Sequence, residues 1–252
     1  MEKEMMLKQD VKTHFRRRSQ KYNASSAWVN DRCLIRKIFE LSDASPKSTV
    51  LDIAAGTGKI AEPFYNQVKY VIGIDLCPKM TDQARPWYNH LVFSAAEKLP
   101  FKDNSFDICV CRQGLQFMKL DDALRQIHRV LKPDGTTIFC HLSAFSEEDK
   151  EITFYIQRLR NPARKNCFLP EDIPNVLDEN QFVDIECHNY ITRESVSRWI
   201  NNGAIDKKQM AKIIEIYRKA PHNFLKIHNV EFRDGDIFDS MLMNIVKAKK
   251  KG

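Results

Sequence analysis

The stretch "VLDIAAGTGKI", residues 50–60, decides the fold of this chain. An apolar run stops at an aspartate, and small residues with two glycines then lead toward a helix that we expect from about Lys59. Glycine has no Cβ, so Gly56 and Gly58 allow the backbone to approach a ligand closely. Such a turn after a strand suits a dinucleotide, a mononucleotide-like cofactor or a phosphate, or it is a tight turn with no ligand.

Strand-like and helix-like segments alternate around this stretch. The strand-like segments are "STVLDIA", "VKYVIGID", "HLVFSAA", "SFDICVCR" and "TTIFCHLSA". Alternation of this kind predicts a parallel sheet that helices cover on both faces. Further helices follow from about residue 146, and two more strand-like segments, "FVDIECHNYIT" and "SMLMNIVKAK", complete the same sheet.

The second strand-like segment ends in Asp75, about twenty residues beyond the glycines, where a carboxylate suits the two hydroxyls of a ribose. Two chemistries share this arrangement. The spacing Gly56-x-Gly58-x-x-Ala61 satisfies a dinucleotide fingerprint, which keeps a nicotinamide-dependent oxidoreductase open. A pattern that begins at Asp52 indicates a different cofactor for the same turn.

Asp52-x-Ala54-x-Gly56-x-Gly58 resembles the first motif of the class I S-adenosylmethionine-dependent methyltransferases. "GIDLCPKM" looks like the second motif of that family, and "AAEKLPFKDNSFDICVC" and "IHRVLKPDG" are similar to its later blocks. "HFRRRSQKYNASSAW" resembles the lid of the ubiquinone/menaquinone-biosynthesis group, which methylates small molecules. These similarities occur in the order that the family requires.

The resemblance implies an α/β fold with a Rossmann-like seven-stranded, mostly parallel sheet whose last strand is antiparallel. We expect a single domain over residues 1–252. Residues 1–45 would form an N-terminal helical lid, 46–145 a cofactor-binding core, and 146–252 the substrate-shaping helices with the last two strands. The helical insertion after the fifth strand would shape the substrate pocket.

The resemblance also implies a site for S-adenosylmethionine, with S-adenosylhomocysteine as product. Asp52 would orient the glycine turn and meet the methionine ammonium, and Asp75 would bind the ribose. The other implied cofactor contacts are Tyr22, Ala54, Gly56, Gly58, Leu76, Met80, Ala95, Ala96, Glu97, Cys111, Arg112 and Gln113. Ala54 replaces the first glycine of the family, and Ala95 replaces an aspartate that often accepts from the adenine amino group.

Three residues are candidates for catalysis. Methyl transfer requires an aligned nucleophile, and an imidazole can remove a proton from it near neutral pH. His141 lies at the carboxyl end of the fifth strand, and His14 lies on the lid. Gln116 falls where similar enzymes contact their substrate. No Cys or His spacing typical of a metal site occurs, so we predict no metal.

The net charge of +7 is concentrated in the runs "KTHFRRRSQK" and "RLRNPARK" and in the C-terminal "KAKKKG". Such runs bind nucleic acid, an anionic membrane surface or an acidic small substrate, or they are solvated surface. Together with the aromatic residues of the insertion, they suggest an aromatic or isoprenoid-like substrate that carries phosphate or carboxylate. Seven scattered cysteines and no long apolar run predict a reduced, cytoplasmic protein without a membrane span.

The function that we expect is methylation of a small metabolite at oxygen, carbon or nitrogen. The protein would act as a monomer or homodimer, without a nucleic acid partner. Two alternatives stay open. An RNA methyltransferase would use the basic runs to bind phosphates, and a protein that binds S-adenosylmethionine without catalysis would share the same motifs.

Overall fold

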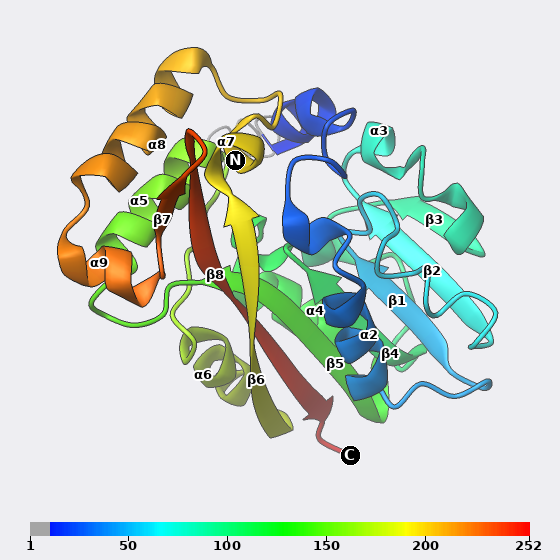
Figure 1. Cartoon of the computed structure of the whole chain (residues 1–252). Helices are drawn as coiled ribbons and strands as arrows, with labels where there is room; N and C mark the ends of the chain where they lie inside the picture. Colours follow the sequence, from blue (N-terminus) through cyan, green and yellow to red (C-terminus); the bar gives the residue numbers. More distant parts are fainter. Residues whose placement is uncertain (1–10) are drawn as a thin grey trace.

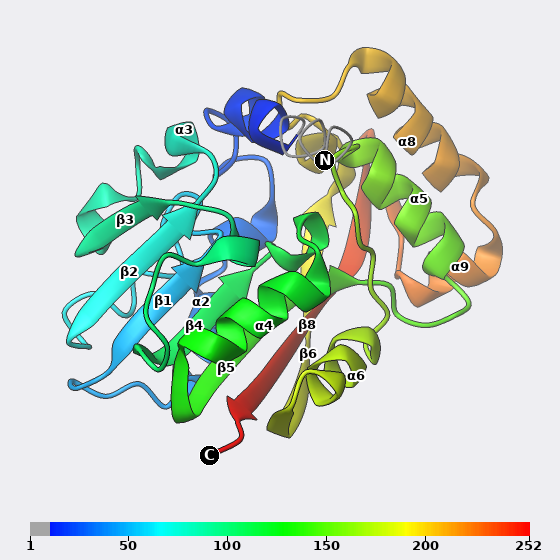
Figure 2. The same ribbon diagram turned by 180° about the vertical axis from the view of Figure 1, so that it is seen from behind.

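One sheet contains every strand of residues 11–252, the part of the chain that this computed structural model describes (Figures 1 and 2). The strands are β1 (Thr49–Ile53), β2 (Tyr70–Asp75), β3 (His90–Phe93), β4 (Phe106–Arg112), β5 (Leu131–Ser143), β6 (Phe182–Ser195), β7 (Glu231–Arg233) and β8 (Asp236–Lys250). Their order is β3-β2-β1-β4-β5-β8-β6, and β7 pairs with β8. Strands β1 to β5 run parallel, whereas β8 is antiparallel to both β5 and β6.

The predicted Rossmann-like α/β sheet with an antiparallel last strand is confirmed, but it has eight strands rather than seven. The additional strand is β7, which forms a hairpin with β8 through Asp234 and Gly235. Both turn residues have positive φ, 53° and 76°. Asp-Gly is a favoured pair for such two-residue hairpins, because their twist matches that of the flanking strands. The eighth strand therefore follows from a local turn signal.

Helices cover both faces of the sheet and gather at one end of it. They comprise helical residues 11–18 and α2 (Arg32–Leu41), α3 (Pro78–Thr81), α4 (Leu120–Val130), α5 (Lys150–Arg160), α6 (Asp172–Glu179), α7 (Val196–Ile200), α8 (Lys207–Lys219) and α9 (His222–Ile227). Figure 1 shows α2 in front of the sheet, and Figure 2 shows α4 and α6 on the opposite face. Helices α5, α7, α8 and α9 lie together beside one end of the sheet (Figure 1). None of the helices within residues 11–252 is long and apolar enough to cross a bilayer.

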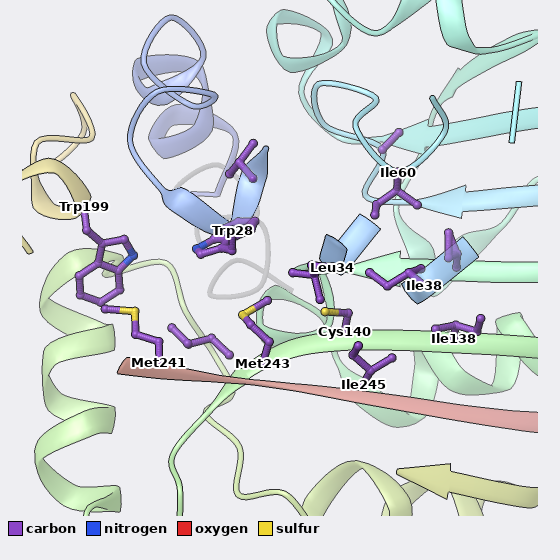
Figure 3. Packing of buried hydrophobic residues seen from close by; sticks show 14 of the residues in the cluster. Trp28, Leu34, Ile38, Ile60, Ile138, Cys140, Trp199, Met241, Met243 and Ile245 are labelled. Carbon is purple, nitrogen blue, oxygen red and sulfur yellow. The ribbon is translucent and has the colours of Figure 1, made fainter. Parts of the chain in front are cut away.

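Two apolar cores lie on opposite faces of the sheet. Successive side chains of a strand point to opposite faces, and in β4 Ile108 and Val110 join one core while Cys109 and Cys111 join the other. Figure 3 shows the first core, in which Leu34 of α2 lies among buried side chains of the sheet. The strands are therefore apolar on both sides, as the sequence pattern predicts for a covered parallel sheet.

The predicted helix from about Lys59 is wrong, because the structure has a series of turns between β1 and β2. Some helix-like bonds occur there, for example from the N–H of Glu62 to the carbonyl of Gly58 at 3.1 Å. Pro63 has no N–H to donate, so the helical ladder is interrupted at that residue. Asn66 then adopts a positive φ of 64°, which a regular helix does not contain.

Candidate active site

A cleft lies at the carboxyl ends of β1, β2 and β4, where parallel sheets commonly bind ligands. Its empty volume of about 730 Å³ includes the open mouth. Ten of the fourteen predicted cofactor residues line this main cleft, namely Tyr22, Ala54, Gly56, Asp75, Leu76, Met80, Ala96, Glu97, Arg112 and Gln113. The sequence motifs therefore converge in one cavity.

Asp75 and Gly56 form the centre of the main cleft. The Asp75 carboxylate accepts hydrogen bonds from the backbone N–H of Gly56 at 2.8 Å and of Cys77 at 2.7 Å. Burial raises the pKa of Asp75, and these backbone N–H groups oppose that rise. Each carboxylate oxygen has a second acceptor position, so Asp75 can still accept from a ligand in the cleft. A Cβ added at Gly56 would be in ordinary van der Waals contact with the Ala54 carbonyl oxygen and the terminal methyl of Met80, both at 3.7 Å, so the positive φ of 53° rather than crowding favours glycine here.

Asp52 lies beside the main cleft, in an adjoining hollow of about 270 Å³ that we call the glycine-turn pocket. Ala54, Gly56 and Arg112 line both cavities. The Asp52 carboxylate is buried and accepts a hydrogen bond from the hydroxyl of Tyr88 at 2.5 Å. Burial raises the pKa of Asp52 to about 7, against the opposing effects of Tyr88 and Arg112.

Three other predicted cofactor residues do not line the main cleft or the glycine-turn pocket. Gly58 packs against the segment before β3, where an added Cβ would meet Ala84 at 2.9 Å. Cys111 belongs to the apolar core, and its burial raises the pKa of the thiol. Ala95 precedes a 3₁₀ turn, and its neighbour Ser94 lines the cleft instead.

The sequence analysis missed eight residues of the main cleft. They are Val11, Phe15, Ile53, Ile74, Ser94, Gly114, Phe117 and Met118. Phe15 and Phe117 meet edge to face, with ring centroids 5.1 Å apart. Phe15 lies within the segment "HFRRRSQKYNASSAW", which resembles the lid of the family, and Phe117 lies within "CRQGLQFM". Nothing in either segment alone indicates that the two rings touch.

Residues 11–22, part of the segment predicted to form a lid, reach the cavities. Val11, Phe15 and Arg18 are spaced by four and three residues, which places them on the same side of the helix at residues 11–18, and Tyr22 lies in the turns that follow it. Tyr22 lines the main cleft, the glycine-turn pocket and a third cavity described below. Trp28 of the same segment also lines the third cavity, whereas α2 packs into the core. Residues 1–10 lie outside the described part of the chain.

Gln116 lines the third cavity, which has an empty volume of about 390 Å³ and which we call the arginine pocket. Its lining consists of Phe15, Arg18, Tyr22, Trp28, Gln113, Gln116, Phe117, Leu142, Gln157, Arg160, Asn161, Arg164 and Trp199. The side-chain Nε2 of Gln116 donates to the side-chain Oε1 of Gln113 at 2.9 Å. Because Gln113 also lines the main cleft, this pair stands between the two cavities.

The two candidate histidines are buried and line neither the main cleft nor the arginine pocket. His141 lies between Phe139 and Phe168, and burial, aided by Arg164, lowers its pKa to about 3. Burial and the charge of Arg18 lower the pKa of His14 to about 3 as well. Both rings are neutral at pH 7, and groups with such low pKa values are weak bases. Their catalytic roles therefore stay predictions without geometric support.

No group of three or more His, Cys, Asp or Glu side chains in residues 11–252 is arranged to hold a metal ion. The polar side chains of the main cleft are the carboxylates of Asp75 and Glu97, the Arg112 guanidinium, the Gln113 amide and the hydroxyls of Tyr22 and Ser94. This donor set suits a nucleoside with an amino-acid tail better than a metal ion.

Comparison with known proteins agrees with the geometry. A model of the methyltransferase domain family matches residues 51–139. Demethylmenaquinone methyltransferase of Streptomyces avermitilis is 36% identical over 117 residues, which are 45% of this chain and 50% of that protein. Malonyl-[acyl-carrier protein] O-methyltransferase of Serratia marcescens is 30% identical over 166 residues, 65% of this chain and 64% of that protein. The chain thus spans between half and two thirds of the length of these relatives.

A solved structure shares most of the fold. The YcgJ protein of Bacillus subtilis superimposes with a TM-score of 0.79 and 23% identity, covering 86% of this chain and 98% of that one. At this identity the likeness concerns the fold, while the sequence matches concern the family. Residues 51–139 thus match the methyltransferase domain family, and the sequence similarities support a class I S-adenosylmethionine-dependent methyltransferase.

Proposed function

We propose that this protein transfers a methyl group from S-adenosylmethionine to an oxygen, carbon or nitrogen atom of a small metabolite. One observation carries the proposal: the Asp75 carboxylate and the Gly56 backbone line one cleft, and the hydrogen bond between them fixes their positions. The relatives named above methylate different molecules, as their names state, so they support the reaction class and leave the acceptor to be found.

The residues of the cleft fit the cofactor in three parts. Asp75 would accept from the ribose hydroxyls, and Leu76 and Met80 would pack against the adenine. Asp52 would attract the ammonium of the methionine end, and Arg112 its carboxylate, because both residues line the glycine-turn pocket. When bound, S-adenosylmethionine supplies a methyl group from a sulfonium centre and leaves as the neutral thioether S-adenosylhomocysteine.

The protein itself would contribute positioning. Tyr22 borders all three cavities, so its ring would hold cofactor and acceptor in one enclosed space. The Gln113–Gln116 pair would orient the acceptor from the arginine pocket toward the main cleft. Holding the reacting atoms in line at near-attack distance can contribute roughly 7–11 kcal/mol to the rate.

We further propose that the protein works as one domain, as a monomer or homodimer, without nucleic acid. All strands of the described part form a single sheet, which supports one folding unit. The seven cysteines are free thiols, which supports a reducing compartment such as the cytoplasm.

A labelling experiment tests the reaction class. The purified protein is incubated with S-adenosylmethionine that carries a tritiated methyl group, together with either a small-metabolite extract or total RNA. We expect label in the small-molecule fraction, and no label with the variant Asp75→Asn. Label in RNA would support the RNA methyltransferase instead. Tight cofactor binding without label in either fraction would support the non-catalytic alternative.

A further inference from the structure

The arginine pocket concentrates positive charge from two distant parts of the chain. Arg18 comes from the first basic run of the sequence, and Arg160 and Arg164 come from the second. Only 3% of Arg18 and 6% of Arg160 is exposed to solvent. Among residues 11–252, no Asp or Glu lines this pocket. Two runs that the sequence alone allows to be solvated surface therefore meet inside the protein.

The carboxylate of Glu194, which attracts Arg160 of this pocket, already has hydrogen-bond partners. Oε1 of Glu194 accepts from Arg198 at 2.6 Å, and its Oε2 accepts from the backbone N–H of Ala27 at 2.6 Å. Burial, followed by the charge of Arg18, holds the pKa of Arg160 well below its usual value. The guanidinium groups thus repel one another, and the described surroundings leave positive charge uncompensated.

Several donors of the pocket have no hydrogen-bond partner among the described residues. They include Nε and Nη2 of Arg18 and Nε of Arg164. Gln157 is 3% exposed, and neither of its side-chain polar atoms is bonded. Arg160, by contrast, donates from Nε to the carbonyl of Trp199 at 3.0 Å. Buried donors without partners are rare and costly in native proteins, so such a group of them favours a polar or anionic partner in this pocket.

The pocket adjoins the main cleft on the acceptor side. Four residues, Phe15, Tyr22, Gln113 and Phe117, line both cavities. The methionine end of the cofactor would lie in the glycine-turn pocket. Within residues 11–252, Tyr22 is the one residue that lines both this pocket and the arginine pocket. A molecule in the arginine pocket would therefore reach the cofactor past Gln113 without occupying the place of its amino-acid tail.

We propose that the arginine pocket binds the anionic end of the methyl acceptor, a phosphate or carboxylate group that Arg18, Arg160 and Arg164 anchor. This inference rests on the proposed function and narrows its substrate class to anionic metabolites. Guanidinium groups bind planar or multi-oxygen anions through paired, charge-assisted hydrogen bonds. The same groups withdraw electron density from the oxygens that they hold, so the anion is the anchor and another atom of the substrate accepts the methyl group.

Calorimetry with simple anions tests this proposal. Inorganic phosphate or acetate is titrated into the full chain saturated with S-adenosylhomocysteine, so that the main cleft is filled. We expect binding that weakens by about tenfold or more in Arg18→Gln and in Arg164→Gln, because each variant removes charge-assisted donors. Arg17→Gln is the matched control, since Arg17 lies next to Arg18 on the same helix but is exposed. Tighter phosphate binding would indicate a phosphorylated acceptor, and tighter acetate binding a carboxylic acid.

Three outcomes would overturn the proposal. One is the absence of anion binding to the unmodified chain, and another is equal weakening in the Arg17→Gln control. The third is a loss of S-adenosylhomocysteine affinity in Arg18→Gln as large as the loss of anion affinity, because the arginines would then hold the cofactor. Unchanged S-adenosylhomocysteine affinity also shows that each variant is folded. If that ligand does not bind at all, the proposed function fails, and titration of phosphate into the free chain still tests the pocket.

Discussion

The backbone angle φ of Ala54 explains why the family motif has glycine at this position. This angle is +60°, a left-handed conformation that costs residues with a Cβ about 1–2 kcal/mol relative to the right-handed one. The resemblance predicted that Ala54 borders the cofactor, and the cleft contains it. Its strained conformation, however, could not be read from the sequence.

Gly58 should be required for stability rather than for a direct cofactor contact. We expect Gly58→Ala to lower the free energy of unfolding by about 1–3 kcal/mol more than Gly235→Ala does, as measured by urea denaturation. Both glycines have positive φ, 77° and 76°, so both variants carry the same conformational cost. Only Gly58 adds a clash, with Ala84 at 2.9 Å, because nothing lies within 4 Å of a Cβ at Gly235. Equal losses in the two variants would contradict this assignment.

Asp52 should make cofactor affinity depend on pH near neutrality. Burial raises its pKa to about 7 in the free protein, and the cationic ammonium of the cofactor would favour the charged carboxylate. Affinity for S-adenosylmethionine should therefore rise as the pH increases through about 7, with proton release on binding. Calorimetry in buffers of different ionisation enthalpy measures this release. Asp52→Asn should abolish it, and the same proton release in that variant would show that another group is responsible.

At the scale of elements, the strands were easier to predict than their connections. Continuous apolar runs marked β1, β2, β4 and β5, because a parallel sheet buries both faces of its strands. The segment after β1 instead looked helical from its motif, while Pro63 interrupts the ladder. The aromatic contact between the lid and the turn after β4 depends on tertiary packing, so no local pattern indicates it.

A buried ion network ties α5, α9 and β8 together. His228 pairs with Asp149 at 3.0 Å and with Asp239 at 2.9 Å. Burial alone would lower the pKa of His228, but the two carboxylates outweigh it and raise the pKa to about 9. The stabilisation is therefore fully present below the unfolded pKa of about 6.5 and is lost as the pH rises through about 9.

We expect this network to contribute about 3 kcal/mol to stability below pH 6.5, since one unit of pKa shift corresponds to about 1.4 kcal/mol. Urea unfolding at several pH values should show stability falling between pH 6.5 and 9, with a much smaller slope in His228→Gln. His222→Gln is the control, because His222 begins helix α9, which His228 follows directly, but His222 is exposed. If His228→Gln keeps the slope of the unmodified chain, the network does not stabilise the fold in this way.

At the scale of the whole molecule, the two halves of the proposed site differ in how far the sequence predicts them. The cofactor half of the site is built from segments that each follow a strand of one sheet, so their meeting could be predicted from strand order. The acceptor half joins Arg18 of the lid to Arg160 and Arg164, more than a hundred residues away. Their meeting depends on how the inserted helices pack, and sequence patterns contain no equivalent rule for that. Accordingly, the two predicted histidines line neither the main cleft nor the arginine pocket. The three arginines that line the arginine pocket were noted in the sequence only as members of basic runs.

The most direct test of the central claim is the affinity of the chain for S-adenosylhomocysteine, measured by calorimetry with and without the Asp75 carboxylate. The unmodified chain should bind, and Asp75→Asn should bind about tenfold to a hundredfold more weakly, because an amide cannot accept from the ribose hydroxyls and both backbone N–H groups together. Asp82→Asn, at an exposed position nearby, should bind normally. No heat of binding to the unmodified chain, or equal affinity in Asp75→Asn, would contradict the assignment of this cleft to the cofactor.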